Sequence, residues 1–161
     1  MFELNSGSIF DLQKRIKILI IKKYKMKRTA TAVWTGTIKE GKGNITTSSE
    51  VLKEAAYSYT SRFKDGPGTN PEELIAAAHA GCFTMKVSAD LAEAGFTPTK
   101  LETTSEVTLS DEKISKSALT LTATIDGISE EEFQKLVNKS KDNCPVSKSL
   151  DMEITLEATL N

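Results

Sequence analysis

The sequence is poor in the residues that usually mark a zinc site or a secreted, disulfide-rich domain. It has one histidine, His79, and two cysteines, Cys82 and Cys144, in 161 residues. The cysteines lie far apart, whereas small secreted domains carry several in a short chain. A structural zinc site needs four nitrogen or sulfur ligands, and these residues supply at most three. We therefore expect neither a zinc module nor a disulfide-stapled fold.

A charge excess and a long apolar run are also missing. The formal net charge is -1, so no overall field attracts nucleic acid or acidic lipid. The longest apolar stretch, residues 16–21, contains Lys17 and falls well short of the roughly 18 residues of a membrane helix. No small-residue cleavage site follows it, which argues against a signal peptide. We expect a cytoplasmic protein with no membrane span and no nucleic-acid partner.

Residues 1–25 differ in composition from the rest of the chain. They hold six Lys/Arg and two Asp/Glu, a balance of +4, which leaves -5 for the remainder (15 minus 20). This segment ends just before a second methionine, Met26. We predict a basic N-terminal extension over residues 1–25 and one domain over residues 26–161. A basic amphipathic helix that touches a membrane or a partner is the alternative for the extension.

The remaining chain alternates between strand patterns and helix patterns. Asn70 and Pro71 predict the start of a long helix that ends near Ala94, before Gly95. A capping-box pattern at Ser129 predicts a second helix, to about residue 141. Period-two segments predict strands at residues 29–36, 44–49, 57–63, 101–109, 118–125 and 153–160. The order predicts an α+β domain with a largely antiparallel sheet.

The middle of the long helix carries little polar surface. From Leu74 to Met85 it is rich in alanine, and His79 is its one ionisable group besides the thiol. Such a helix is expected to be central and buried on most sides. Its alanines and Gly81 allow another element to approach closely, and that element could belong to a partner subunit.

The residues alone leave the chemistry open. A free cysteine often serves as a small buried hydrophobe, and no C-x-x-C pattern supports a thioredoxin-type dithiol. His79 lies three residues before Cys82 on the same helical face. That spacing allows a Cys–His hydrolase or acyl transferase, although no residue is evident to orient the imidazole.

Four motifs carry a resemblance that narrows this choice. Residues 68–83 read Gly-Thr-Asn-Pro-Glu-Glu-Leu-Ile-Ala-Ala-Ala-His-Ala-Gly-Cys-Phe and residues 143–147 read Asn-Cys-Pro-Val-Ser. These resemble the two cysteine motifs of the OsmC/Ohr family of peroxide-reducing proteins, and residues 34–43 and 59–63 also match. The resemblance covers about residues 26–161, with the motifs in the family's order. Histidine at position 79 resembles the OsmC branch, whereas the Ohr branch tends to carry an aromatic residue there.

The resemblance implies an OsmC-like fold and four catalytic residues. Cys82 corresponds to the peroxidatic thiol, Cys144 to the resolving thiol, Arg62 to the arginine that activates the nucleophile, and Glu72 to the carboxylate that holds it. Organic hydroperoxides would be reduced to alcohols through a Cys82 sulfenic acid and a Cys82–Cys144 disulfide, in oxidative stress defence. No bound cofactor is implied. An external dithiol, for which the family suggests a dihydrolipoyl group, would reduce the disulfide.

Distance along the helix predicts a shared site. A thiol buried in an apolar helix has a raised pKa, which a fixed guanidinium would counter. Glu72 and Cys82 are ten residues apart, roughly 15 Å along one helix. We therefore expect Glu72 and Arg62 to meet Cys82 of the other subunit in an intertwined two-fold homodimer with antiparallel central helices. An apolar substrate pocket is expected at that interface, lined by Phe83 and Met85 unless these are ordinary core residues.

Two other functions remain as alternatives. The first is a non-catalytic protein that binds small apolar ligands on the same fold, with structural cysteines. A Cys82–Cys144 distance too long for a disulfide would support it. The second is the His79 hydrolase, in which replacement of His79 would abolish activity. The peroxidase mechanism is expected to tolerate that replacement.

Overall fold

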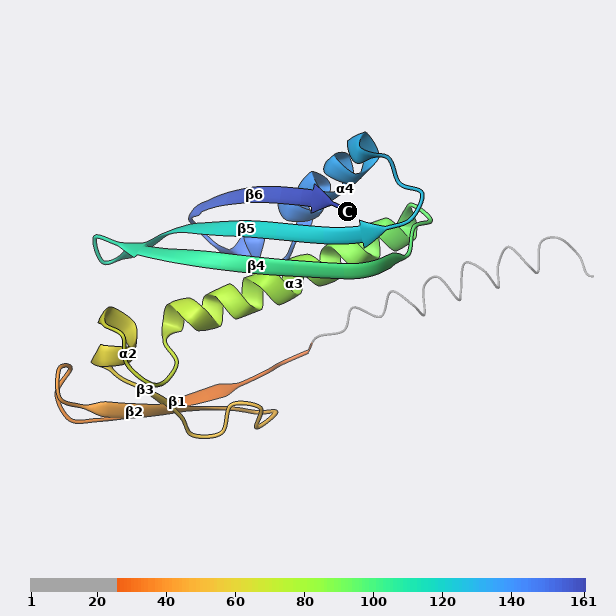
Figure 1. Ribbon diagram of the computed structural model, residues 1–161. Coiled ribbons are helices and arrows are strands. Elements are labelled where there is room, and N and C mark those ends of the chain that lie inside the picture. The colour runs from red at the N-terminus through yellow and green to blue at the C-terminus, as the bar shows by residue number, and fades with distance from the viewer. Residues whose placement is uncertain (1–25) are drawn as a thin grey trace, which may run out of the picture.

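The computed structural model describes residues 26–161, and the predicted extension with its alternative helix lies outside the described residues. The elements are β1 (Ala30–Thr35), β2 (Lys42–Thr47), β3 (Ala55–Tyr57), α2 (Tyr59–Phe63), α3 (Pro71–Glu93), β4 (Pro98–Ser110), β5 (Lys113–Ile125), α4 (Glu130–Asn143), the 3₁₀ turn η1 (Ser147–Ser149) and β6 (Glu153–Leu160). They form two three-stranded sheets, β1-β2-β3 and β4-β5-β6 (Figure 1). The predicted α+β class is confirmed, but two sheets replace the expected single one.

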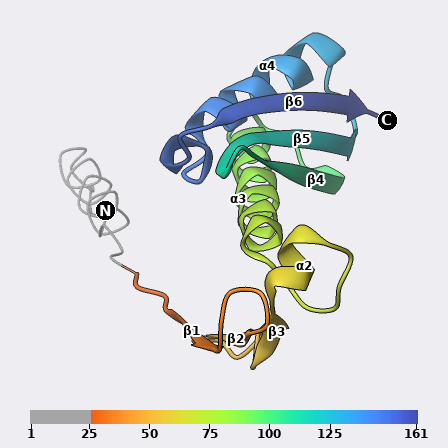
Figure 2. The same cartoon turned by 90° about the vertical axis from the view of Figure 1, so that its left-hand side faces the viewer.

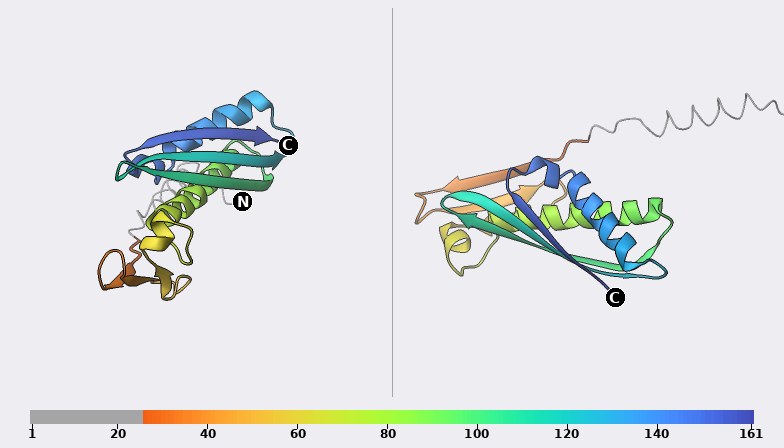
Figure 3. Two further views of the ribbon diagram at one scale, coloured as in Figure 1. Left: turned by 60° about the vertical axis from the view of Figure 1, so that its left-hand side comes forward. Right: turned by 90° about the horizontal axis from the view of Figure 1, so that it is seen from above.

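The N-terminal sheet is a small antiparallel unit that stands apart from the C-terminal sheet and is joined to it by α3 (Figure 3). Trp34 and Tyr57 pack with ring centroids 5.3 Å apart. Gly43 pairs with both residues across the sheet, and a Cβ there would collide with the Tyr57 ring. The absence of a side chain at Gly43 therefore lets the two aromatic rings lie together over the sheet.

The prediction of a strand over residues 57–63 is wrong beyond Tyr57. Ser58 caps the short helix α2: its hydroxyl accepts from the Ser61 backbone N–H, and the Ser61 hydroxyl accepts from the Ser58 N–H. Tyr59 and Phe63, one turn apart, pack with ring centroids 4.8 Å apart. Aromatic residues four positions apart fit a strand as well as a helix. The two reciprocal hydrogen bonds between Ser58 and Ser61 stabilise the helix.

The C-terminal sheet is mixed. β4 and β5 form a long antiparallel hairpin whose turn residues, Asp111 and Glu112, have φ values of 49° and 61°. Positive φ at both positions is typical of the type I′ turn, which matches the twist of the strands. The hairpin is therefore longer than the two segments predicted for it. β6 pairs with β5 in parallel, because the chain returns through α4 before entering the sheet.

The core lies between the C-terminal sheet and two helices that cover one of its faces. α3 supplies Phe83, Val87 and Leu91, and α4 supplies Phe133 and Val137. The inward-facing side of β5 completes it with Leu119, Leu121, Ala123 and Ile125. Figure 2 shows both helices against this sheet, with α3 continuing beyond it toward the N-terminal sheet. Within residues 26–161, no helix is long and apolar enough to cross a membrane.

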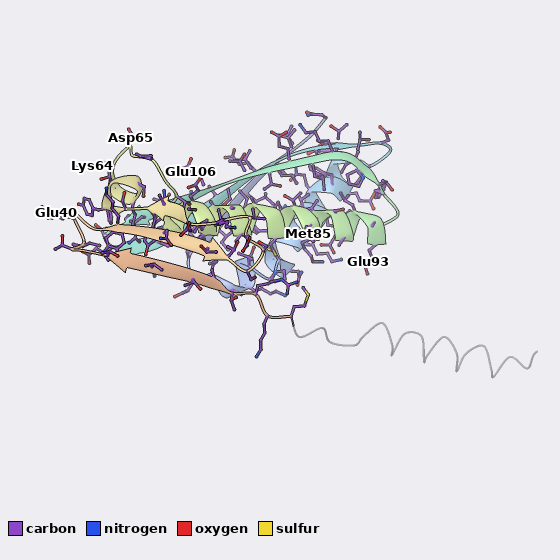
Figure 4. All side chains as sticks on the ribbon, turned by 90° about the horizontal axis from the view of Figure 1, so that it is seen from below. Glu40, Lys64, Asp65, Met85, Glu93 and Glu106 are labelled. Atoms are coloured by element: carbon purple, nitrogen blue, oxygen red, sulfur yellow. The ribbon has the colours of Figure 1, made fainter. Side chains whose placement is uncertain are left out.

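The bounds of α3 follow the predicted local signals. The Asn70 side chain accepts from the Glu73 N–H at 2.8 Å, and Gly95 follows the helix with φ of 90°. The burial predicted for most sides of this helix is found on one side of it alone. Small residues at positions 77, 78, 81, 88 and 89 are exposed, and Met85 is 76% exposed (Figure 4). Within residues 26–161 of a single chain, nothing covers this face of α3, which is rich in small residues.

Candidate active site

The structure brings the two cysteines together. Cys82 is partly buried near the middle of α3, and Cys144 caps the C-terminus of α4 with no exposed surface. Their sulfur atoms are 3.3 Å apart, and both thiols are free. A disulfide could form with a small movement, because the S–S bond is only about 2.05 Å long. The long separation that would have supported purely structural cysteines is not found.

Asp90 holds the end of α4 against α3. Its carboxylate accepts from the Ser140 hydroxyl at 2.6 Å and pairs with Lys86 at 2.6 Å. Burial alone would raise the pKa of Asp90, but the hydrogen bonds from Lys86 and Ser140 bring it below its usual value. Ser140 lies one helical turn before Cys144, so this link helps to fix Cys144 beside Cys82.

The two thiols differ in acidity. Burial raises the pKa of Cys82, with a hydrogen bond from the Val146 N–H in opposition, and the predicted direction is confirmed. Burial also acts to raise the pKa of Cys144, but hydrogen bonding, most of all by the Ser147 backbone N–H and then by Cys82, brings the pKa below its usual value. Access distinguishes the two thiols as nucleophiles, because Cys144 has no exposed surface whereas Cys82 is only partly buried.

Arg62 and Glu72 form a second pair, at the start of α3. The arginine Nε lies 3.1 and 3.2 Å from the two carboxylate oxygens, and Nη2 lies 2.7 Å from Oε1. The hydrogen bond to Glu72 raises the pKa of Arg62. Burial opposes ionisation of Glu72, yet Arg62 lowers its pKa overall. The Arg62 guanidinium also lies 5.2 Å from the Phe63 ring centroid, so it is held in one orientation.

The two pairs are not brought together within one chain. Glu72 and Cys82 lie on the same helix, ten residues and therefore about 15 Å apart along its axis. Arg62 contacts Glu72 and not Cys82. Among residues 26–161, no cationic group contributes to the pKa of Cys82. One chain thus contains the four candidate residues as two separate halves of a site.

A cavity of about 240 Å³ adjoins the Arg62 half of the site. Its wall is mostly apolar, and it is lined by Trp34, Ile38, Tyr57, Ser58, Tyr59, Arg62, Phe63 and Pro71. Phe83 and Met85 do not line it. Phe83 is a fully buried core residue, which was the alternative expected for it. Met85 lies on the exposed face of α3. The pocket-lining role predicted for these two residues is not found in the single chain.

His79 is buried beside the cysteines but does not contact the thiol of Cys82. Its Nδ1 lies 2.7 Å from the Ser117 hydroxyl and its Nε2 lies 2.9 Å from the Ser147 hydroxyl. Burial lowers its pKa, which favours the neutral imidazole. A Cys–His hydrolase needs a direct bond from the imidazole to the nucleophile, so this arrangement argues against one. No group of three metal-ligating side chains occurs in the part of the chain that the structure describes.

The sequence pattern gave no sign of Ser117 and Ser147 as site residues. They lie 38 and 68 positions from His79 in the sequence, and serine is too common a residue to mark a site by itself. Ser147 belongs to the second cysteine motif, which was the one available signal.

Comparisons with known proteins agree on the family. A family model described as OsmC-like protein matches residues 64–159. Peroxiredoxin OsmC of Escherichia coli is 47% identical over 133 residues, which are 80% of this chain and 93% of the relative. An organic hydroperoxide resistance protein-like relative from Staphylococcus aureus is 34% identical over 60% of this chain and 72% of its own length. The chain belongs to the OsmC-like family.

A solved structure supports the same assignment. It is described as an organic hydroperoxide resistance protein OsmC from Legionella pneumophila, and it is 28% identical with a TM-score of 0.60. The match covers 85% of this chain and 99% of that one.

Proposed function

We propose that this protein is a peroxiredoxin-like hydroperoxide reductase, which reduces organic hydroperoxides to alcohols through a Cys82 sulfenic acid and a Cys82–Cys144 disulfide. The observation that carries the proposal is the pair of free thiols, 3.3 Å apart, of which one is accessible and the other is buried. Family membership supports a peroxide-related redox role, since its relatives bear the names peroxiredoxin and organic hydroperoxide resistance protein. The physiological role would be defence against oxidative stress.

In the first step the Cys82 thiolate attacks the terminal peroxide oxygen. The O–O bond breaks, a Cys82 sulfenic acid forms, and the alkoxide leaves and takes up a proton to become the alcohol. The sulfur supplies the two electrons that the peroxide accepts. Attack requires the thiolate, but burial raises the pKa of Cys82. The step therefore needs a positive group, and residues 26–161 of one chain do not provide one at this thiol.

A second subunit would provide that group. Residues 72 and 82 lie symmetrically about residue 77, which is exposed on the small-residue face of α3. If two α3 helices pack antiparallel about an axis near Ala77, Glu72 of each chain lies opposite Cys82 of the other. The Arg62–Glu72 pair of one chain would then stabilise the thiolate and the leaving alkoxide in its partner.

Gly81 supports such packing. A Cβ added there would meet nothing within 4 Å in the single chain, so nothing in the described residues requires glycine. Glycine in a helix interior costs about 1 kcal/mol relative to alanine. A partner helix lying close against α3 would explain why a residue without a side chain stands at this position.

The apolar cavity beside Arg62 is the proposed substrate site. A fixed guanidinium in its wall would orient the peroxide group, while Trp34, Tyr59 and Phe63 would surround an alkyl chain. Alkyl and lipid hydroperoxides should therefore react faster than hydrogen peroxide. Equal rate constants for both would contradict this part of the proposal.

Regeneration completes the cycle. Cys144 would attack the sulfenic acid and form the disulfide, which an external dithiol, proposed to be a dihydrolipoyl group, would reduce by exchange. No bound cofactor takes part. A cytoplasmic location, also proposed, would keep such thiols available.

The test is the consumption of an organic hydroperoxide by the pure protein with dihydrolipoamide as the reductant. Wild type should turn over. Cys82→Ser should lose turnover, and Cys144→Ser should consume about one equivalent of peroxide and then stop. Wild type that shows neither turnover nor a single stoichiometric oxidation would refute the peroxidase. The apolar cavity would then favour the alternative of a non-catalytic protein for small apolar ligands.

A further inference from the structure

A second cavity continues the Arg62 cavity toward the tip of the β4–β5 hairpin. Its volume is about 580 Å³. The two cavities share four wall residues: Ile38, Tyr59, Arg62 and Phe63. The hairpin tip and α2 lie at the same end of the molecule (Figure 1). A substrate that binds beside Arg62 can therefore extend from the first cavity into the second.

The hairpin closes the second cavity with one apolar and two acidic residues. Leu109 is half-buried, and the two turn residues, Asp111 and Glu112, are exposed. Ser110 and Lys113 pair across the ends of the two strands, so the turn between them contains only two residues. A turn this short leaves the backbone little freedom. The backbone that carries the two carboxylates is thus fixed at the cavity wall.

The two carboxylates of the turn are not neutralised by an ion pair. Neither Asp111 nor Glu112 forms one with any group among residues 26–161. Arg62 is the one cation among the described wall residues of the two cavities, and its Nη2 lies 2.7 Å from Oε1 of Glu72. The Arg62–Glu72 pair has no net charge. The negative charge of the turn is therefore not offset within the walls.

Charged residues close to the walls in sequence do not reverse this sign. The residues considered are those in the walls and those within two positions of a wall residue. Four are positive and six are negative, a balance of -2. They are Lys39, Arg62, Lys64 and Lys113, and Glu40, Asp65, Glu72, Glu73, Asp111 and Glu112. A substrate thus meets mostly apolar walls in a negative field.

We propose that Asp111 and Glu112 determine the substrate class by repelling hydroperoxides that carry a carboxylate. The inference rests on the proposed peroxidase function and deepens it. Hydroperoxides without negative charge, such as alkyl and esterified lipid hydroperoxides, are the preferred substrates, and hydroperoxides of free fatty acids are disfavoured. The two residues bind no ligand and take no part in the chemistry. They are specificity determinants that act through charge at the cavity wall.

Coulomb's law gives the size of the effect. In water, two like unit charges roughly 8 Å apart repel each other enough to change a binding constant about two- to threefold. Two carboxylates together should therefore weaken the binding of an anionic substrate by about fivefold. Salt reduces the effect, because the charges of the turn are exposed to solvent. An uncharged substrate of the same shape should not respond to either carboxylate.

The test compares two substrates that differ in one charge. They are cumene hydroperoxide with a carboxylate in the para position of its ring, and the methyl ester of that compound. The full-length wild type and the double variant Asp111→Asn/Glu112→Gln are assayed for kcat/KM with dihydrolipoamide as the reductant. Asparagine suits the φ of 49° at position 111, and both replacements keep the shape of the side chain. The variant should therefore fold as the wild type does.

Asp126→Asn is the matched control. Asp126 is an exposed carboxylate just beyond the other end of β5, whose 13 residues span roughly 40 Å. Its replacement removes one negative charge from the protein without changing the cavity. Any effect of net charge alone would appear in this variant.

A gain confined to the charged substrate is the expected result. At low salt the double variant should raise kcat/KM for the carboxylate about fivefold and change that for the ester less than about twofold. The gain should shrink as salt is added, because the Debye length falls from about 30 Å at 0.01 M to about 3 Å at 1 M. Asp126→Asn should leave both values unchanged.

Four outcomes would overturn the proposal. An unchanged kcat/KM for the carboxylate would exclude a charge effect of the turn. An equal gain on both substrates would assign the effect to the shape of the hairpin, and an equal gain in Asp126→Asn would assign it to net charge. If the wild type consumes neither substrate, the peroxidase itself fails and the inference with it. That result is seen in the wild type alone and is distinct from the other three.

Discussion

At the scale of single residues, His79 couples the stability of the fold to pH. Burial lowers its pKa from the ordinary value of 6.5 in the folded chain, whereas the unfolded chain keeps that value. As pH falls below about 6.5, the unfolded state binds the proton first and gains stability. The contribution of His79 is therefore fully favourable above pH 6.5 and declines as pH falls toward the folded-state pKa.

Urea unfolding of the pure protein at pH 7.5 and pH 5.5 measures this effect. The His79 contribution should cost wild type at most about 1.4 kcal/mol in total, because it is lost only between pH 6.5 and pH 5.5. The His79→Gln variant should lose less, because glutamine takes up no proton. An identical loss in both proteins would assign the pH dependence to other groups.

Helix positions could be predicted at the scale of elements, because their signals are local. Asn70, Gly95 and Ser129 mark helix ends through hydrogen bonds and backbone angles within a few residues. α2 was missed because Tyr59 and Phe63 fit a strand period as well as a helical turn. The parallel pairing of β6 was missed because it depends on the crossover through α4.

In the candidate site, too, the residues that a sequence motif marks could be predicted and the others could not. The family resemblance gave Arg62, Glu72, Cys82 and Cys144 by their motifs, and the structure brings them together as two pairs. Ser117 and Ser147, which hydrogen-bond to His79, come from distant elements, and only Ser147 belongs to a motif. Tertiary packing alone brings Ser117 to His79, so no local pattern could reveal it.

The contact between α3 and α4 should matter for stability and for disulfide closure. In Asp90→Ala, Lys86 loses its ion-pair partner and the Ser140 hydroxyl loses one hydrogen bond. We expect the free energy of unfolding to fall by about 2–3 kcal/mol, as for other buried, hydrogen-bonded charges. Slower closure of the Cys82–Cys144 disulfide should accompany it, because the end of α4 is less firmly held. Denaturant unfolding measures the first effect. The rate at which the disulfide appears after one equivalent of an alkyl hydroperoxide is added, followed by mass spectrometry, measures the second.

Glu93→Ala is the matched control for this prediction. Glu93 lies one turn further along α3, is exposed, and approaches Lys139 only to 3.9 Å. Its replacement should change stability by less than about 0.5 kcal/mol. If Asp90→Ala were equally mild, the Asp90 contact would not be what fixes α4 on α3.

For the whole molecule, the layout of one chain is that of an incomplete site. α3 leads from the N-terminal sheet to the C-terminal sheet (Figure 1). The Arg62–Glu72 pair lies at the start of α3, and Cys82 lies near its middle, beside Cys144. Its uncovered face of small residues lies between these two halves. An antiparallel partner helix would cover that face and bring each half against its complement. The proposed dimer thus explains the open helix face, the raised pKa of Cys82 and the distant arginine together.

Mixed dimers test this arrangement directly. Cys82→Ser and Arg62→Ala should each be inactive as pure proteins. Co-expressed in equal amounts, they should form half of the dimers as mixed pairs, and each mixed pair would contain one intact site. Peroxide turnover should therefore recover to about a quarter of the wild-type value. Cys82→Ser mixed with Cys144→Ser is the control that should not recover turnover, because both thiols of a site belong to the same chain. If the first mixture stays inactive although mixed dimers form, Arg62 serves its own chain and the shared site is wrong.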